Sequence, residues 1–242
     1  LPAPEAMRVV TIVQARMGST RLPGKVLMPL AGRPVLSRVI ERIRLARNSG
    51  TVVVATTTSP KDDAVEELCR ESGETFFRGS EADVLARFAG CARSHDADIV
   101  VRVTADCPLL SAAALDAAVD QLIGHDLDYV EVQKLPRGFP AEAIRGTALQ
   151  RAHHEATDAH DREHVTPYLF RNPQKFAVEM PDAAPADRRP ELRFTLDTPD
   201  DYRLIAAIYE RLGDKVHQAS ANDFLAAVAD DTQLLSAAHE GR

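Results

Sequence analysis

The sequence has no tryptophan, and only three cysteines stand among its 242 residues. Cys69, Cys91 and Cys107 are odd in number and form no C-x-x-C pair. This usage disfavours both a disulfide framework and a zinc site, and it fits a reducing compartment. We therefore expect a cytoplasmic protein.

Long apolar runs and a basic excess are also missing. No apolar stretch approaches the roughly 20 residues that a membrane-spanning helix needs. With 29 basic and 36 acidic residues the net charge is −7, so no broad positive field indicates nucleic acid as a partner. Residues 1–7 have neither a charged nor an apolar signal region, so they are interpreted as a leader or an expression remnant.

The usual nucleotide-binding motifs are absent as well. A P-loop has four residues between its glycines and a Ser or Thr after its Lys. Here five residues separate Gly18 from Gly24, and Val26 follows Lys25. No G-x-G-x-x-G follows the first apolar run, which disfavours a dinucleotide-binding fold of that type.

Residues 9–13 are instead a short run of β-branched side chains, and the loop that follows them has three cations and two glycines. A buried strand that enters a glycine-containing basic loop is suited to holding a polyphosphate, because backbone N–H groups and cations converge there. The alternative is an ordinary solvated surface loop. The cations are Arg16, Arg21 and Lys25.

The first half of the chain alternates β-branched runs with stretches of helical periodicity. Strands are predicted at 51–56, around 76–77 and at 98–103, with helices between them. This order predicts an α/β fold with a mostly parallel central sheet and helices on both faces.

The second half is less regular. It predicts strands at 127–133, 175–180 and 192–196, and helices at 147–157, at 160–170, from Pro199 and from about Ala221. We expect a single domain over 8–230, with a small protruding arm near 131–180 and a C-terminal tail at 231–242.

Two aspartates follow predicted strands at the edge where open α/β sheets bind ligands. Asp106 comes after 99–103, and Asp197 comes after 193–196. Such carboxylates suit Mg²⁺, which keeps positions for water and phosphate. The alternative role is helix capping. It is the better interpretation for Asp200 and Asp201, because Thr198 and Pro199 begin a capping box.

Two further groups have simpler explanations. Ser80 and Asp83 lie between a strand and a helix, and Ser80 as an N-cap accounts for them. His160 and His164 share a helical face at metal-ligand spacing, but no third ligand is evident, so ordinary packing is the better interpretation.

Five blocks of the sequence resemble a known family. Residues 14–25, QARMGSTRLPGK, are similar to the phosphate loop of the cytidylyltransferases that make CMP-sugars, and above all of the spore-coat polysaccharide branch. The CMP-3-deoxy-manno-octulosonate and CMP-acylneuraminate synthetases are more distant relatives. Four later blocks match that branch in order; they are 78–87, 101–109, 161–168 and 196–201.

The resemblance implies a Rossmann-like nucleotide-diphospho-sugar-transferase (GT-A-like) fold, usually dimeric through the arm. It implies CTP and a sugar-type acceptor as substrates, Mg²⁺ as cofactor, and displacement of pyrophosphate from the α-phosphorus. Mg²⁺ would be bound by Asp106 and Asp197. The residues that would contact the nucleotide are Ala15, Arg16, Gly18, Ser19, Arg21, Lys25, Ser80 and Asp83.

Within this set, Lys25, Arg16 and Asp106 are the catalytic candidates, because transfer at phosphorus depends on positioning and charge stabilisation. The acceptor is expected at the arm, with Arg137, Glu142, Arg162, Glu163 and His164 as candidates. One departure from the family is Ala105, where glycine is usual.

Alternative functions remain at this stage. A metal-dependent glycosyltransferase of the same fold would normally carry a D-x-D motif after a middle strand, and none is found there. A phosphonate or sugar-phosphate acceptor, or UTP in place of CTP, keeps the same chemistry. A non-catalytic nucleotide sensor would release no pyrophosphate.

Overall fold

The computed structural model describes residues 7–239, so residues 1–6 of the expected leader and 240–242 of the expected tail lie outside it. A central sheet has the order β5-β4-β1-β6-β8-β7-β9. Its first four strands pair in parallel. They are β5 (Thr75–Gly79), β4 (Thr51–Thr57), β1 (Val9–Gln14) and β6 (Ile99–Thr104).

The other half of the sheet contains one reversed strand. β8 (Glu142–Arg145) runs antiparallel to both β6 and β7 (Tyr129–Glu131), and β9 (Val178–Glu179) pairs in parallel with β7. The expected mostly parallel sheet is therefore confirmed. β8 was not predicted, because it is only four residues long and lies in a segment dominated by turn signals.

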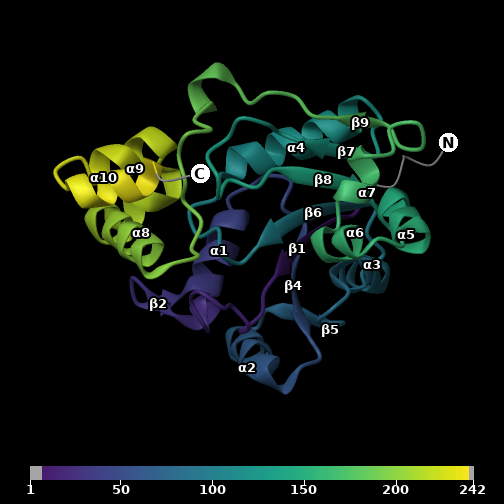
Figure 1. Cartoon of the computed structure of the whole chain (residues 1–242), viewed down its shortest axis with the longest axis horizontal. Helices are drawn as coiled ribbons and strands as arrows, with labels where there is room; N and C mark the ends of the chain where they lie inside the picture. Colours follow the sequence, from purple (N-terminus) through teal and green to yellow (C-terminus); the bar gives the residue numbers. More distant parts are fainter. Residues whose placement is uncertain (1–6, 240–242) are drawn as a thin grey trace.

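Helices cover both faces of the sheet, as expected (Figure 1). One core lies under α1 (Val35–Ile43), α2 (Asp63–Ser72) and α4 (Ala112–Gly124). The second core lies under α3 (Val84–Ser94), α5 (Gly146–Glu155) and α7 (Pro167–Phe170), and α6 (Ala159–His164) lies against α3.

The alternation of side chains along β1 explains why its sequence is a continuous apolar run. Val10 and Ile12 pack into the second core, whereas Val13 packs into the first, and all three are fully buried. A strand that is covered on both faces has no position for an exposed polar side chain, so it does not show the alternation of a half-exposed strand.

A third core gathers at one end of the molecule, where α8 (Pro199–Leu212), α9 (Ala221–Ala227) and α10 (Thr232–His239) lie together (Figure 1). Phe194 and Phe224 stack edge to face in it, with ring centroids 5.5 Å apart. The residues assigned to a C-terminal tail thus include a helix whose Ala238 is buried.

Short elements complete the described chain. They are β2 (Pro29–Leu30) with β3 (Arg33–Pro34), and the 3₁₀ turns η1 (Lys25–Leu27), η2 (Pro60–Asp62), η3 (Pro185–Asp187) and η4 (Gly213–Gln218). Within residues 7–239, no helix is both long and apolar enough to cross a membrane.

The segment 131–180, where an arm is expected, places β8 inside the central sheet and buries Leu149 and Leu169 in the second core. One expectation needs correction. The strand predicted at 192–196 is an extended segment with a single bridge between Arg193 and Arg137. Its apolar residues are buried against the helices of the third core rather than in the sheet.

The predicted capping box is confirmed. The Thr198 hydroxyl accepts the Asp201 amide, and the Asp201 carboxylate accepts the Thr198 amide in return. At α3 the cap is Asp83, whose carboxylate accepts the amide of Ala86. Ser80 was predicted for that role, but its hydroxyl instead accepts the Asp83 amide one turn earlier.

Candidate active site

A cavity of about 580 Å³ lies at the carboxyl ends of β1 and β6, the edge at which open α/β sheets bind ligands. Its walls are formed mainly by the basic loop after β1, the end of β6 and the chain before α8, and Arg137 and His164 are added from other segments. Its lining residues include Arg16, Gly18, Ser19, Arg21, Lys25, Asp106, Arg137, His164 and Asp197. The predicted basic loop and both predicted aspartates are therefore brought together.

The basic loop folds back on the carbonyl of Met17, which accepts the amides of Ser19 and Gly24. Gly24 has φ 69°, a left-handed conformation that glycine adopts without steric cost. The Ser19 hydroxyl accepts the Leu22 amide at 3.3 Å and so keeps its own proton for another acceptor.

Some loop amides are left for a ligand. Within residues 7–239, the amides of Gly18, Thr20 and Arg21 donate to no other residue. These three residues line the cavity, and unpaired N–H groups of neighbouring residues next to cations are suited to binding an anion.

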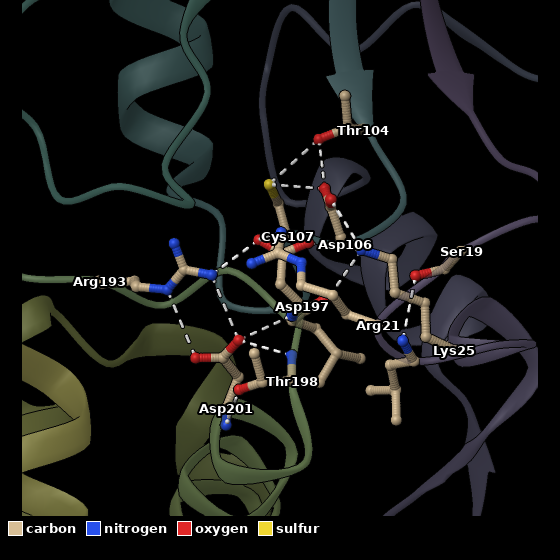
Figure 2. Close-up of polar contacts among 12 residues, drawn as sticks. Ser19, Arg21, Lys25, Thr104, Asp106, Cys107, Arg193, Asp197, Thr198 and Asp201 are labelled. Atoms are coloured by element: carbon tan, nitrogen blue, oxygen red, sulfur yellow. Dashed lines mark hydrogen bonds and ion pairs between the residues drawn. The ribbon is translucent and has the colours of Figure 1, made fainter. Parts of the chain in front are cut away.

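Lys25 is at the centre of the polar network (Figure 2). Its ammonium group lies 3.0 Å from Asp106 Oδ2 and 2.9 Å from Asp197 Oδ1, and it donates to the Leu196 carbonyl at 2.7 Å. Burial of the side chain opposes its charge, but the two carboxylates outweigh this effect and raise the pKa of Lys25. Lys25 is therefore a fixed cation that uses three donors at once.

Asp197 is surrounded by cations. Besides Lys25, its carboxylate contacts Arg193 at 2.7 Å and Arg21 at 3.3 Å. Burial favours the neutral acid, but Lys25, Arg193 and Arg21 together lower the pKa of Asp197 to about 2. Asp201 supports the position of Asp197, because its carboxylate accepts the Asp197 amide and contacts Arg193 (Figure 2).

Asp106 is held by the strand that precedes it. Thr104, the last residue of β6, donates its hydroxyl to Asp106 Oδ1 at 2.5 Å. The Asp106 carbonyl accepts the Leu196 amide at 2.8 Å, which ties the end of β6 to the chain that carries Asp197. This backbone contact, rather than a second strand, places the two aspartates side by side.

The two aspartates fit a divalent cation. Both bind the same ammonium atom, so their oxygens already converge on one positive charge, and 26% and 14% of their side chains remain exposed to solvent. Mg²⁺ is usually bound by one or two carboxylates, with water and phosphate completing the shell. No group of three or more His, Cys, Asp or Glu residues gathers for a metal among residues 7–239.

Three residues of the pocket were not predicted as site residues, and each has a buried atom without a hydrogen-bond partner in the described chain. These atoms are Gln14 Oε1, Thr195 Oγ1 and Arg102 Nε. Buried polar groups are normally paired, so unpaired ones in a cavity wall are available to water or to a ligand. The sequence pattern could have identified all three, because each is a polar residue within an apolar strand or extended segment.

Not every predicted nucleotide contact reaches the cavity. Ala15 is buried, and its amide donates to the Ala55 carbonyl. Ser80 and Asp83 are absent from the cavity wall and belong to the N-terminus of α3, where Asp83 pairs with Arg162. Burial of Asp83 favours its neutral form, but Arg162 and the Ala86 amide outweigh this effect and lower the pKa of Asp83.

The acceptor candidates are divided between two places. Arg137 and His164 line the main cavity, and Glu142 lines a smaller cavity beside it. Arg162 is held by Asp83 and by the carbonyls of His153 and Ala156, and Glu163 is exposed and lines neither cavity.

Comparison with known proteins identifies the family. The family model described as cytidylyltransferase matches residues 10–226, which is most of the chain. The chain belongs to the cytidylyltransferase family. A relative from Bacillus subtilis, the spore coat polysaccharide biosynthesis protein SpsF, is 33% identical over 212 residues, 86% of this chain and 88% of its own. An uncharacterized protein from Methanocaldococcus jannaschii is 38% identical over 198 residues, 82% of each chain.

Solved structures share the fold of this chain. A cytidylyltransferase from Leptospira borgpetersenii superposes with a TM-score of 0.85 at 29% identity, over 95% of this chain and 97% of its own. A CMP:2-keto-3-deoxy-manno-octonic acid synthetase in complex with CTP has a TM-score of 0.65 at 16% identity, over 84% and 98% of the chains. The fold is thus the expected Rossmann-like nucleotidyltransferase fold of GT-A type.

Proposed function

We propose that this cytidylyltransferase uses CTP and transfers its CMP group to a hydroxyl of a sugar-type acceptor. The acceptor oxygen forms a bond to the α-phosphorus, the bond from that phosphorus to the bridging oxygen breaks, and pyrophosphate leaves. The observation that carries the proposal is the position of Lys25 between two carboxylates, beside a basic loop with unpaired amides. That cavity can hold phosphate charge and a cation at the same time.

The triphosphate would lie along the basic loop. Arg16 and Arg21 are exposed at the cavity wall, and the free amides and the Ser19 proton supply further donors. Guanidinium groups and backbone amides bind phosphate oxygens strongly because the hydrogen bonds are charge-assisted. Such fixed donors also stabilise the charge that develops on the departing pyrophosphate.

Lys25 would divide its donors between the protein and the nucleotide. All three are used within the protein, two by carboxylates and one by the Leu196 carbonyl. A phosphate oxygen that approaches Asp106 and Asp197 meets the same ammonium group, so one donor would move to the phosphate. The side chain would then link the triphosphate to the aspartates.

Asp106 and Asp197 would hold Mg²⁺, with the remaining ligands from water and the phosphates. The bound ion would supply Lewis-acid stabilisation of the negative charge on the reacting phosphates. Asp197 stays ionised well below neutral pH, because three cations contact it. The proton of the attacking hydroxyl would pass to solvent or to Asp106.

The test of this function is pyrophosphate release. Wild-type protein is incubated with CTP and Mg²⁺ and with pools of sugars, sugar phosphates and phosphonates. Asp106→Asn and Lys25→Ala are expected to remain folded and to lose most turnover, whereas Lys61→Ala, on an exposed lysine outside the cavity, is expected to keep it. Wild-type turnover by Asp106→Asn would contradict the proposed metal site.

Two other outcomes would identify the alternatives. Transfer of a sugar from a sugar nucleotide, without triphosphate binding, would indicate a glycosyltransferase. CTP binding with no pyrophosphate release from any pool would indicate a nucleotide sensor.

A further inference from the structure

Three charged residues form a row across the sheet next to the main cavity. Arg102 on β6 is directly opposite Glu142 on β8, and Glu142 is directly opposite Glu131 on β7. Because β8 is antiparallel to both neighbours, the row lies at the carboxyl ends of β6 and β7. It therefore occupies the ligand-binding edge of the sheet, beside Asp106.

The row is negative overall and largely buried. Arg102 donates to Glu142 at 2.7 Å, with 18% and 11% of the two side chains exposed. The hydroxyl of Tyr129 lies 3.2 Å from Glu142 and 3.3 Å from Glu131. A phenol has one proton, so it serves one carboxylate at a time, and Arg102 alone balances two acids. Burial, together with the charge of Glu142, raises the pKa of Glu131.

These side chains line a cavity of about 260 Å³, together with residues of the 132–141 segment. Arg102 lines this cavity and the main one, so the two cavities adjoin at this residue. Its Nε is buried and, within residues 7–239, has no hydrogen-bond partner. The cavity is smaller than the roughly 300–1,000 Å³ of usual ligand pockets, so it suits part of a small acceptor.

We propose that Glu131, Glu142 and Arg102 form the acceptor subsite, and that this subsite selects an acceptor with hydroxyl or ammonium groups over one with a carboxylate or phosphate there. The proposal rests on the proposed cytidylyltransferase function and names the substrate class of the same site. Carboxylate oxygens accept hydrogen bonds from hydroxyl and ammonium groups.

An anionic group would be disfavoured for an electrostatic reason. Arg102 is already paired with Glu142, and Lys134, the other cation in the wall of this cavity, is paired with Asp182. A carboxylate placed in the cavity would therefore approach Glu131 and Glu142 without an unpaired cation in the cavity wall. Like charges that are close together and shielded from water repel strongly. Arg16, Arg21 and Lys25, which line the main cavity, lie around the proposed triphosphate site and would be engaged there.

The experiment compares matched acceptors that differ in one group. Pyrophosphate release is measured with CTP and panels of neutral sugars, amino sugars, uronic acids and sugar phosphates. CTP affinity is measured in parallel by calorimetry. We expect turnover from the neutral or amino classes. We expect Glu131→Gln and Glu142→Gln to raise the KM of that acceptor by about tenfold or more, with CTP affinity unchanged.

A second readout separates selectivity from a structural effect. Glu131→Gln is expected to reduce the preference for the uncharged acceptor over its uronic acid counterpart by about tenfold, because one repulsive charge is removed. Tyr129→Phe keeps both carboxylates and is expected to leave that preference unchanged. Urea midpoints show whether each variant is folded, and Glu131→Gln, on the less buried acid, covers the case in which Glu142→Gln fails to fold.

Each remaining outcome overturns the proposal. Turnover confined to uronic acids or sugar phosphates, or an unchanged preference in folded Glu131→Gln, would refute the subsite. So would CTP binding without turnover of any neutral or amino acceptor, which leaves the nucleotide site intact. If the wild-type protein does not bind CTP, the proposed function is refuted, and the subsite with it.

Discussion

Asp201 is the residue through which the fold supports Asp197, so its removal gives a sharp test of the site architecture. One oxygen of Asp201 accepts the amides of Asp197 and Thr198, both at 2.8 Å. The carboxylate also contacts Arg193 at 3.3 Å, and each side chain of that pair is only 9% exposed. Asp201→Ala therefore breaks a buried ion pair and half of a capping box.

The size of the effect follows from these contacts. Removal of one partner from a buried ion pair costs about 3–5 kcal/mol, and we expect the lower end because Arg193 keeps its contact with Asp197. A loss of about 3 kcal/mol corresponds to a fall in Tm of about 6–12 °C in a chain of this size. The measurement is urea unfolding followed by circular dichroism, together with a thermal scan.

The neighbouring residue provides the control. Asp200 forms an ion pair with Arg203 on the same first turn, but the two side chains are 66% and 71% exposed. Asp200→Ala is expected to cost under about 1 kcal/mol, since exposed pairs contribute little. If the two variants lose stability equally, the junction at Asp197 does not depend on Asp201, and our account of the site is wrong.

Three further predictions concern other parts of the chain. Gly138 has φ 102° and an added Cβ would lie 2.7 Å from the Phe194 backbone, so Gly138→Ala should cost about 2 kcal/mol or more in urea unfolding. Gly124→Ala, at a helix position with open space around it, should instead be neutral or stabilising by up to about 1 kcal/mol. Hydrogen bonds from Lys175, Arg151 and Tyr168 lower the pKa of Glu155 from 4.5 to about 2. The stability that this provides is complete above about pH 4.5 and is lost as the pH falls toward 2, so the urea midpoints of wild type and Glu155→Gln should converge on acidification; a constant difference would contradict this. Burial raises the pKa of Cys69 to about 11 and of Cys91 to about 12, so both thiols should react with a disulfide reagent near pH 8 only after unfolding; rapid reaction of the folded protein would contradict their burial.

The sequence was sufficient where local pattern and long-range structure agree. The apolar run of β1 was predictable because a strand buried on both faces must be apolar, and the cations and glycines of the loop after it are read directly from the sequence. The capping box at Thr198 was predictable for the same reason, since it depends only on neighbours along the chain.

The remaining features depend on contacts between distant segments. β8 is short, and it is a strand because β6 and β7 pair with it on both sides. Asp197 is near Asp106 because the Leu196 amide reaches the Asp106 carbonyl, not because a strand precedes it. The bridge that Lys25 makes between both aspartates, and the row of Arg102, Glu142 and Glu131, are equally invisible to local periodicity.

The most direct test of the central proposal is the binding of CTP, measured by calorimetry against UTP, ATP and GTP, first with Mg²⁺ and then with EDTA. We predict selective CTP binding that weakens in EDTA and is abolished by Lys25→Ala but not by Lys61→Ala. Absence of triphosphate binding, or CTP binding that is unaffected by Lys25→Ala, would contradict the proposed site.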